Sequence, residues 1–227
     1  MKNQRRKIQV FVSFLLRSIM ILLFLIALWQ SDLNWVFGSG FAVFLTFLPM
    51  ILERNYHITL PWILEVLIVF ALFLHIGGGV LSMYYTIPVY DKFAHFVSSF
   101  LVAFISFAAI YILDEYWDGL HMDRRAMAFV VIVSTMAFGV IWEFIEWSSD
   151  LVFGTHEQWG LNDTMTDLLV DTIGGVFMAF FGASFMKSGK WISLTKDFNE
   201  DIESFLDTLK QNKREEKKEG FLKKKEK

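Results

Sequence analysis

Long apolar segments constrain this chain more than any other feature. Six runs are separated by short polar stretches, and they lie near residues 8–29, 35–52, 60–83, 93–113, 126–147 and 166–186. A helix needs about 20 mostly apolar residues to cross the hydrocarbon core of a bilayer, and each run approaches or exceeds that length. Hydrophobic residues make up 55% of the sequence, more than is usual for a soluble domain. We therefore predict an all-α, polytopic transmembrane helix bundle of about six spans.

Basic residues predict the orientation of this bundle. Lys and Arg concentrate in the cytoplasmic loops of membrane proteins. Placing the N-terminus in the cytoplasm brings most other basic loop residues to the same side, namely Arg54, Arg124, Arg125, Lys187 and Lys190. In this topology Lys92 falls in an outer loop. We expect a multi-pass protein of the plasma membrane with its N-terminus and C-terminus in the cytoplasm.

The chain changes character after residue 187. Between Trp191 and Leu209, apolar residues recur every three or four positions among acids and amides, which predicts an amphipathic helix on the cytoplasmic surface. Residues 213–227 mix Lys with Glu and carry little apolar surface, which predicts a solvated charged tail. The domain prediction is therefore a six-helix transmembrane domain over residues 1–187, followed by a cytoplasmic segment over residues 188–227. Membrane lipids are the expected partners, nucleic acid is not, and the pattern specifies no oligomeric state.

Ionisable side chains interrupt the later apolar runs. Such a group costs about 2.5–3.5 kcal/mol at the centre of a membrane helix on insertion scales, so it usually marks a pairing or a function. In the fourth run, Asp91 and His95 share a helical face. At the end of the fifth run, Glu143, Glu146 and Asp150 are spaced by three and four residues and share another.

The sixth run adds a ladder of acids. Asp163, Asp167 and Asp171 stand four residues apart, which makes successive members neighbours on one helix face. The predicted topology brings the start of the fourth run, the end of the fifth and the start of the sixth to the outer side, and His75 in the third run reaches the same half. We expect these groups to form one outward-facing cluster.

A cluster of carboxylates repels itself unless it is protonated or neutralised. A divalent metal, shared protons or Lys92 would each serve. A histidine with carboxylates suits zinc, manganese or iron, whereas carboxylates and water suit magnesium or calcium, and the absence of cysteine excludes a thiolate site. Asp163 and Asp171 lie about 12 Å apart along a helix, so one ion can use only neighbouring members of the ladder. The predicted site comprises the metal ligands His95, Asp163, Asp167 and Asp171, the catalytic residues Glu143 and Glu146, and the further candidates Asp91, Lys92, His75 and Asp150.

Helix packing is the alternative interpretation of the same residues. Polar groups hydrogen-bond helices to one another and cap helix ends, and Asp163 is a reasonable N-cap for the sixth helix. Capping does not account for Glu143, Asp167 and Asp171, because these acids fall inside apolar sequence.

Aromatic and charged residues surround the predicted outer surface. Trp142 and Trp159 are typical of the aromatic belt at a membrane interface. His156 and Glu157 stand together in the segment 148–165, and we expect a solvent-exposed pair there rather than metal ligands.

Three ordered motifs carry a resemblance to a known family. They are Asp91-Lys92-Phe93-Ala94-His95-Phe96, then Trp142-Glu143 through Glu146-Trp147 to Asp150, then Asn162-Asp163-Thr164 through Asp167 and Asp171 to Gly174. Over roughly residues 35–185 the chain resembles the YjdF family of bacterial inner-membrane proteins and, more distantly, the VanZ-like proteins. The VanZ-like pattern has Gln and Asn where this chain has Trp147 and Asp171. The resemblance implies a bacterial membrane protein and supplies no established activity, although VanZ-like proteins are associated with glycopeptide resistance.

The residues themselves favour a metal-dependent membrane hydrolase or transferase acting on a lipid or lipid-linked cell-envelope substrate. Acids and an imidazole at headgroup depth could hold a metal that polarises an ester or phosphoryl oxygen. The sequence shows neither a nucleophile with its base nor an HExxH pair. A proton- or cation-coupled transporter is the first alternative, although residues 130–139 and 177–185 contain no charged group to continue a path inward. A non-catalytic accessory protein of the cell envelope is the second.

Overall fold

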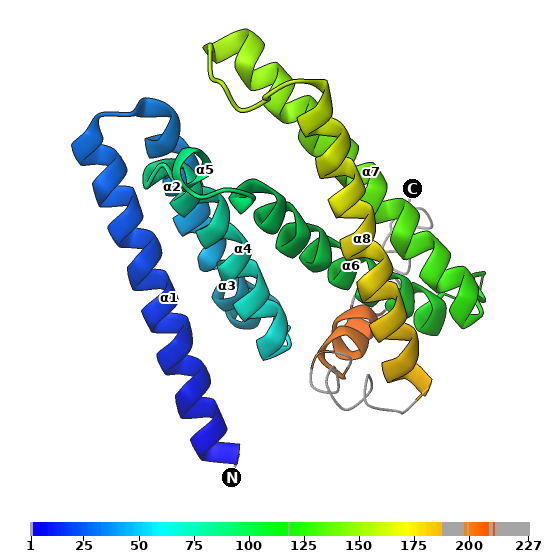
Figure 1. The fold of residues 1–227 in the computed structure, drawn as a ribbon. Coiled ribbons are helices and arrows are strands. Elements are labelled where there is room, and N and C mark those ends of the chain that lie inside the picture. The colour runs from blue at the N-terminus through cyan, green and yellow to red at the C-terminus, as the bar shows by residue number, and fades with distance from the viewer. Residues whose placement is uncertain (1, 118, 188–197, 199, 209–210, 212–227) are drawn as a thin grey trace, which may run out of the picture.

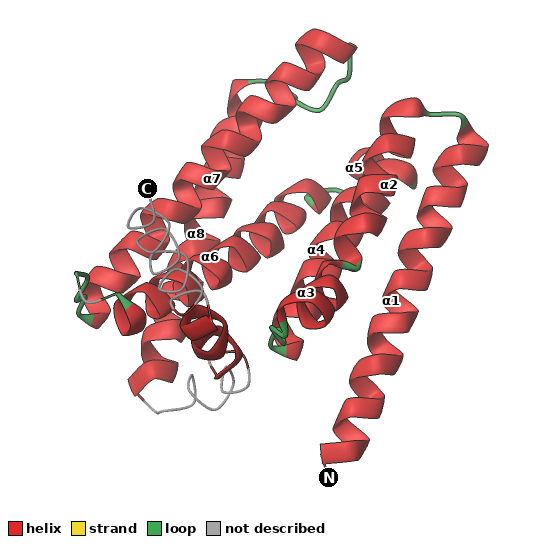
Figure 2. Cartoon of the chain, turned by 180° about the vertical axis from the view of Figure 1, so that it is seen from behind, coloured by secondary structure: helices red, strands yellow, loops and turns green. Residues whose placement is uncertain are grey.

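The computed structural model describes residues 2–117, 119–187, 198, 200–208 and 211, and in this part the chain forms helices joined by loops (Figure 2). The helices run in chain order as α1 (Lys2–Gln30), α2 (Leu33–Thr46), α3 (Leu48–Tyr56), α4 (Trp62–Val80), α5 (Met83–Thr86), α6 (Tyr90–Tyr116), α7 (Arg124–Phe153) and α8 (Leu161–Lys187). Their arrangement is shown in Figure 1 and, from behind, in Figure 2. The predicted all-α class is confirmed.

Several helices have the length and composition of membrane spans. Within the described residues, five segments qualify, and they are Leu33–Tyr56, Trp62–Val80, Tyr90–Asp114, Arg124–Phe153 and Leu161–Phe185. The apolar part of α1, Phe14–Gln30, is shorter. Large apolar side chains lie exposed on the outside of the bundle, as Phe129, Phe144 and Phe180 do, which suits contact with lipid. The protein is a polytopic membrane protein with five to six membrane-capable helices.

The second span is divided into two helices. α2 begins after Asp32, whose side chain accepts hydrogen bonds from the backbone N–H groups of Asn34 and Trp35. It ends at Thr46, and α3 begins at Leu48 with Pro49 in its first turn. Proline has no N–H group to donate to a preceding turn. In the first turn of a helix that N–H would have no partner within the helix, so Pro49 costs least where α3 begins.

The fourth, fifth and sixth runs form longer helices than their apolar segments indicate. α6 starts at Tyr90, α7 continues to Phe153 and α8 starts at Leu161. α7 ends where Gly154 takes a left-handed conformation with φ of 66°. Asp91, Asp150 and Asp163 therefore lie within the end turns of helices rather than in loops.

The helices pack in two groups. α1, α2 and α4 pack together around Met20, Ala27 and Val80, and α6, α7 and α8 pack together around Phe107, Met127 and Met178. α4 lies against α6 and joins the groups. In Figure 1, α8 runs beside both α6 and α7, so the ionisable residues of the last three spans come from helices in direct contact.

The chain crosses the bundle in alternate directions. Residues 31–32, 81–89 and 154–160 lie at one end, which we call the site end (Figure 1). The start of α1 and the end of α8 lie at the opposite end. The helical segment 200–208 also lies at that opposite end, since Asp201 Oδ2 accepts a hydrogen bond of 2.8 Å from the Thr59 N–H. The rest of the predicted amphipathic helix, residues 191–197, 199 and 209, and the predicted charged tail, residues 213–227, are outside the described residues.

Candidate functional site

Small residues allow the last three spans to approach closely at the depth of the acids. A Cβ atom built on Gly174 of α8 would collide with the Ser99 hydroxyl and lie 3.1 Å from the Phe96 carbonyl oxygen, both in α6. A Cβ on Gly139 of α7 would lie 2.5 Å from Asp171 Oδ2 of α8. These glycines therefore give the backbones room to bring the polar faces of three helices together.

Lys92 lies inside the acidic cluster. Its Nζ atom is 2.9 Å from Asp91 Oδ2, 2.5 Å from Asp163 Oδ1 and 2.7 Å from Asp167 Oδ1. The ammonium thus contacts one acid on its own helix and two on α8. Lys92 occupies the first turn of α6 rather than an outer loop. Asp163, which the sequence predicts as a metal ligand, forms an ion pair with Lys92.

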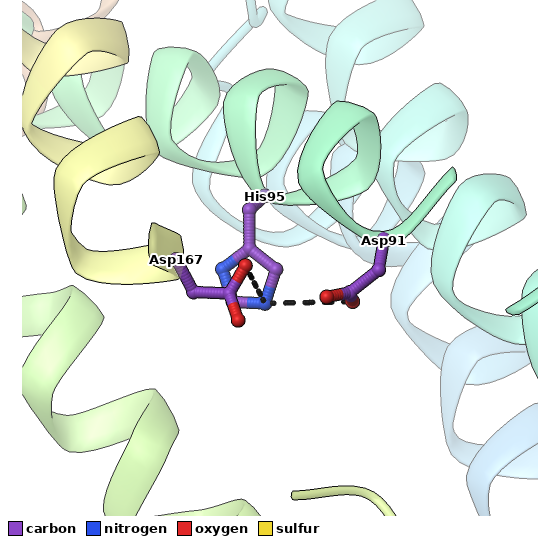
Figure 3. A group of neighbouring side chains, drawn as sticks. All are labelled: Asp91, His95 and Asp167. Atoms are coloured by element: carbon purple, nitrogen blue, oxygen red, sulfur yellow. Dashed lines mark ion pairs between the residues drawn. The ribbon is translucent and has the colours of Figure 1, made fainter. Parts of the chain in front are cut away.

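His95 occupies the centre of the cluster and is 7% exposed. Its Nδ1 atom is 3.3 Å from Asp171 Oδ1, and its Nε2 atom is 3.7 Å from Asp91 Oδ1 and 3.8 Å from Asp167 Oδ1. Figure 3 shows the imidazole between Asp91 and Asp167. In the tautomer whose Nδ1–H group donates a hydrogen bond to Asp171, Nε2 carries a lone pair that can bind a metal, which is the arrangement found around metal-ligating histidines.

Two glutamates of α7 complete the cluster. Glu146 Oε1 accepts a hydrogen bond of 2.8 Å from Trp142 Nε1. Glu143 is only 5% exposed, and among the described residues neither of its carboxylate oxygens has a hydrogen-bond partner. Ligand atoms of His95, Glu143 and Glu146 all lie within 4.8 Å of one another, and those of Asp91, His95 and Asp167 do so as well. Two potential metal-binding triads therefore share His95.

The cluster carries more acid than base. Its six carboxylates belong to Asp91, Glu143, Glu146, Asp163, Asp167 and Asp171, and its cationic groups are Lys92 and, when protonated, His95. If all six acids are ionised and both Lys92 and His95 are protonated, the cluster carries four excess negative charges. Because buried like charges repel strongly, this site needs bound protons or a further cation.

Two cavities are lined by residues of the cluster. The inner cavity, of about 150 Å³, is lined in part by His95, Ser98, Thr135 and Asp171. The outer cavity, of about 360 Å³, has walls that include Lys92, Asp163 and Trp159. His75, Tyr84 and Glu146 line both cavities, so the two share a wall.

Comparison with known proteins identifies the family. Residues 11–188 match the family described as "Predicted membrane protein (DUF2238)". The chain belongs to this family. It is also similar to an uncharacterized protein of Thermotoga maritima, with 31% identity over 135 residues that cover 59% of this chain and 68% of that protein. No solved structure matches the chain. The DUF2238 assignment agrees with the resemblance to YjdF, and none of these matches supports a relation to VanZ-like proteins.

Two predicted site residues of this DUF2238 protein form their hydrogen bonds with residues outside the cluster. Asp150 accepts hydrogen bonds from the Thr155 hydroxyl and from the N–H groups of Glu157 and Gln158, so it orders the 154–160 loop. His75 Nδ1 lies 3.1 Å from the Tyr84 hydroxyl. The other predicted residues all fall within the cluster described above.

Three residues join the site without having been predicted for it. Trp142, expected in an aromatic belt, donates a hydrogen bond to Glu146. The two residues are four positions apart on one helix, and this spacing could have indicated the contact. Tyr84 contacts His75, and nothing in the sequence indicates that contact. Burial and the Asp91 carboxylate raise the pKa of Tyr84, so it stays a neutral phenol.

Glu157, expected to be solvent-exposed, is half-buried in the outer cavity, where burial and the Asp150 carboxylate raise its pKa.

Proposed function

We propose that this protein binds a divalent metal ion between His95, Glu143 and Glu146 and acts on the headgroup of a membrane lipid or lipid-linked substrate. The observation that carries the proposal is the Glu143 carboxylate, which is buried and, in the described part of the chain, has no hydrogen-bond partner for either oxygen. A buried carboxylate without a partner is costly, and a bound cation removes that cost. One imidazole and two carboxylates suit zinc, manganese or iron.

The surrounding residues support this choice of triad. Lys92 already pairs with Asp91, Asp163 and Asp167, so those acids are neutralised in part without a metal. The Asp171 carboxylate contacts His95 Nδ1 and favours the tautomer with a free Nε2. In this proposal Glu143 and Glu146 serve as ligands rather than general bases.

A metal at this position would polarise an ester or phosphoryl oxygen or activate a water molecule. The protein's own residues orient and enclose the reaction. Trp142 holds one oxygen of Glu146, Asp171 holds the imidazole, and the outer cavity admits a headgroup from the site end. We place the site end on the outer face of the plasma membrane, with both termini in the cytoplasm, because the basic residues Arg54, Arg124 and Arg125 flank the opposite end.

Transport is the competing function, and the contacts of the acids argue against it. Asp163 and Asp167 are held by Lys92, and Asp171 lies on His95. Deeper in the bundle, the hydroxyls of Ser99 and Thr135 donate to backbone carbonyls of their own helices rather than to a relay. A flux across proteoliposome membranes that Asp171→Asn abolishes would favour transport instead.

Metal analysis of the purified full chain tests the proposal. Protein in a nonionic detergent is equilibrated with Zn²⁺, Mn²⁺, Fe²⁺ or Mg²⁺ in turn, freed of excess ion and assayed by mass spectrometry of the elements. We expect about one ion per chain for the preferred metal, and a loss of at least tenfold in affinity in Glu143→Gln and His95→Ala, since each variant removes a ligand. Glu53→Gln, an exposed acid at the end of α3, is the matched control and should bind normally. Absence of every metal from the wild type, or equal binding by Glu143→Gln, would refute the metal site.

A further inference from the structure

The outer cavity is walled by aromatic rings. They belong to Trp35, Tyr84, Tyr85, Tyr90 and Trp159. Tyr85 and Trp159 are stacked with ring centroids 5.5 Å apart and planes 28° apart, and both are more than half exposed. Tyr84 and Tyr90 meet edge to face, with centroids 5.4 Å apart. Faces of electron-rich rings around a cavity attract cations.

The same walls are acidic. Four carboxylates line the outer cavity, from Asp91, Glu146, Glu157 and Asp163. The wall's one lysine, Lys92, is already surrounded by three acids. When the four acids are ionised, they outnumber the three cations that Lys92, His75 and His156 would supply if both histidines were protonated, and an anion would then meet net repulsion there.

Negative charge continues inward from the outer cavity. Glu146 lines both cavities, and its carboxylate lies within 4.8 Å of a Glu143 carboxylate oxygen. Glu143 is 5% exposed, and neither of its carboxylate oxygens has a hydrogen-bond partner among the described residues. Glu146 therefore lies on the wall of the outer cavity and also belongs to the proposed metal triad, so a ligand in the outer cavity lies beside the triad.

We propose that the outer cavity binds the ammonium group of a zwitterionic phospholipid headgroup. This rests on the proposed function and names its substrate class, because the phosphoryl oxygens of the same headgroup would lie toward His95, Glu143 and Glu146. The ammonium contacts the Tyr85–Trp159 pair and the Glu157 carboxylate, and cation–π and ionic attraction together distinguish it from a headgroup that carries only negative charge or hydroxyls.

Binding of short-chain lipids to the full-length protein tests the proposal. The probes are dihexanoyl phosphatidylethanolamine, dihexanoyl phosphatidylglycerol and free ethanolamine, titrated in nonionic detergent and followed by tryptophan fluorescence and by thermal unfolding. We expect the ethanolamine lipid to bind at least several-fold more tightly than the glycerol lipid. Trp159→Leu and Glu157→Gln should each weaken the ethanolamine lipid roughly three- to tenfold and leave the glycerol lipid unchanged.

Matched variants keep the test specific. Trp29→Leu removes a tryptophan that is 85% exposed on α1 and absent from the cavity walls, and Glu53→Gln removes an exposed acid at the opposite end. Both should bind as the wild type does. Equal affinity for the two lipids, or equal effects of Trp159→Leu and Trp29→Leu, would overturn the proposal. Binding of free ethanolamine as tightly as the lipid would also overturn it, because the source would then be a soluble amine.

Failure of this inference can be told apart from failure of the proposed function. Trp159→Leu and Glu157→Gln leave His95, Glu143 and Glu146 intact, so both variants should retain the metal. A wild-type protein that binds metal without preferring the ethanolamine lipid overturns the headgroup inference alone. A protein that prefers the ethanolamine lipid in the presence of chelator, and never binds metal, refutes the metal site and supports the ammonium cavity.

Discussion

Replacement of Lys92 by methionine should destabilise the bundle strongly. Methionine keeps most of the side-chain volume and removes the ammonium, whose contacts of 2.9, 2.5 and 2.7 Å reach Asp91, Asp163 and Asp167. The loss leaves three close carboxylates without their cation. Asp167 suffers most, because its side chain is only 2% exposed.

The exposure of the lysine sets the magnitude of the effect. Breaking a buried ion pair costs about 3–5 kcal/mol, whereas an exposed pair is worth about 1 kcal/mol or less. The Lys92 side chain is 25% exposed, so we expect a loss of about 2–4 kcal/mol in the free energy of unfolding. At about 2–4 °C per kcal/mol for a chain of this size, a loss of about 3 kcal/mol lowers the unfolding temperature by about 6–12 °C.

Thermal unfolding of detergent-purified protein at neutral pH, with chelator present, measures this change. Arg54→Met, which removes an exposed cation at the end of α3, is the control and should shift the unfolding temperature by less than about 2 °C. Adding Asp163→Asn to Lys92→Met should recover part of the loss, because it removes one of the repelling acids. If Lys92→Met shifts the unfolding temperature no more than Arg54→Met does, then the Lys92 ammonium does not offset the charge of Asp91, Asp163 and Asp167.

Two further predictions concern helix packing and pH. Gly174→Ala should destabilise the protein by about 1–3 kcal/mol in thermal unfolding, because the added Cβ meets the Ser99 hydroxyl and the Phe96 carbonyl. The loss of stability should be smaller in a Ser99→Ala background. An equal loss in both backgrounds would contradict this contact. Glu157→Gln should raise the unfolding temperature at neutral pH. Burial and the Asp150 carboxylate raise the pKa of Glu157 above 4.5, so the stability that its neutral form contributes is complete below pH 4.5 and is lost as pH rises through the higher folded-state pKa. A wild-type and variant difference that is constant from pH 4 to 8 would show that Glu157 does not titrate in this way.

Properties that depend on neighbours along the chain could be predicted from the sequence. Membrane spans depend on the length and apolarity of each run, and these are local quantities, so the helical bundle followed from the sequence alone. Helical periodicity likewise placed Asp163, Asp167 and Asp171 on one face of α8. The ends of the helices were less predictable, because polar turns such as the one around Asp150 continue α7 beyond its apolar run.

The partner of each charged group was decided only by the tertiary structure. Lys92 and Asp163 are 71 residues apart in the chain, and His95 and Asp171 are 76 apart. Periodicity gives the direction of a side chain around its own helix axis, whereas the distance to another helix depends on how closely the two backbones approach. Gly174 and Gly139 set that approach through space, by leaving room for Ser99 and for Asp171. The sequence therefore predicted the helix faces that carry the acids, but it did not predict that Trp142, Tyr84 and Glu157 lie at the same site. The helix crossings determined that Lys92 pairs with one group of acids, while Glu143 is buried without a hydrogen-bond partner among the described residues.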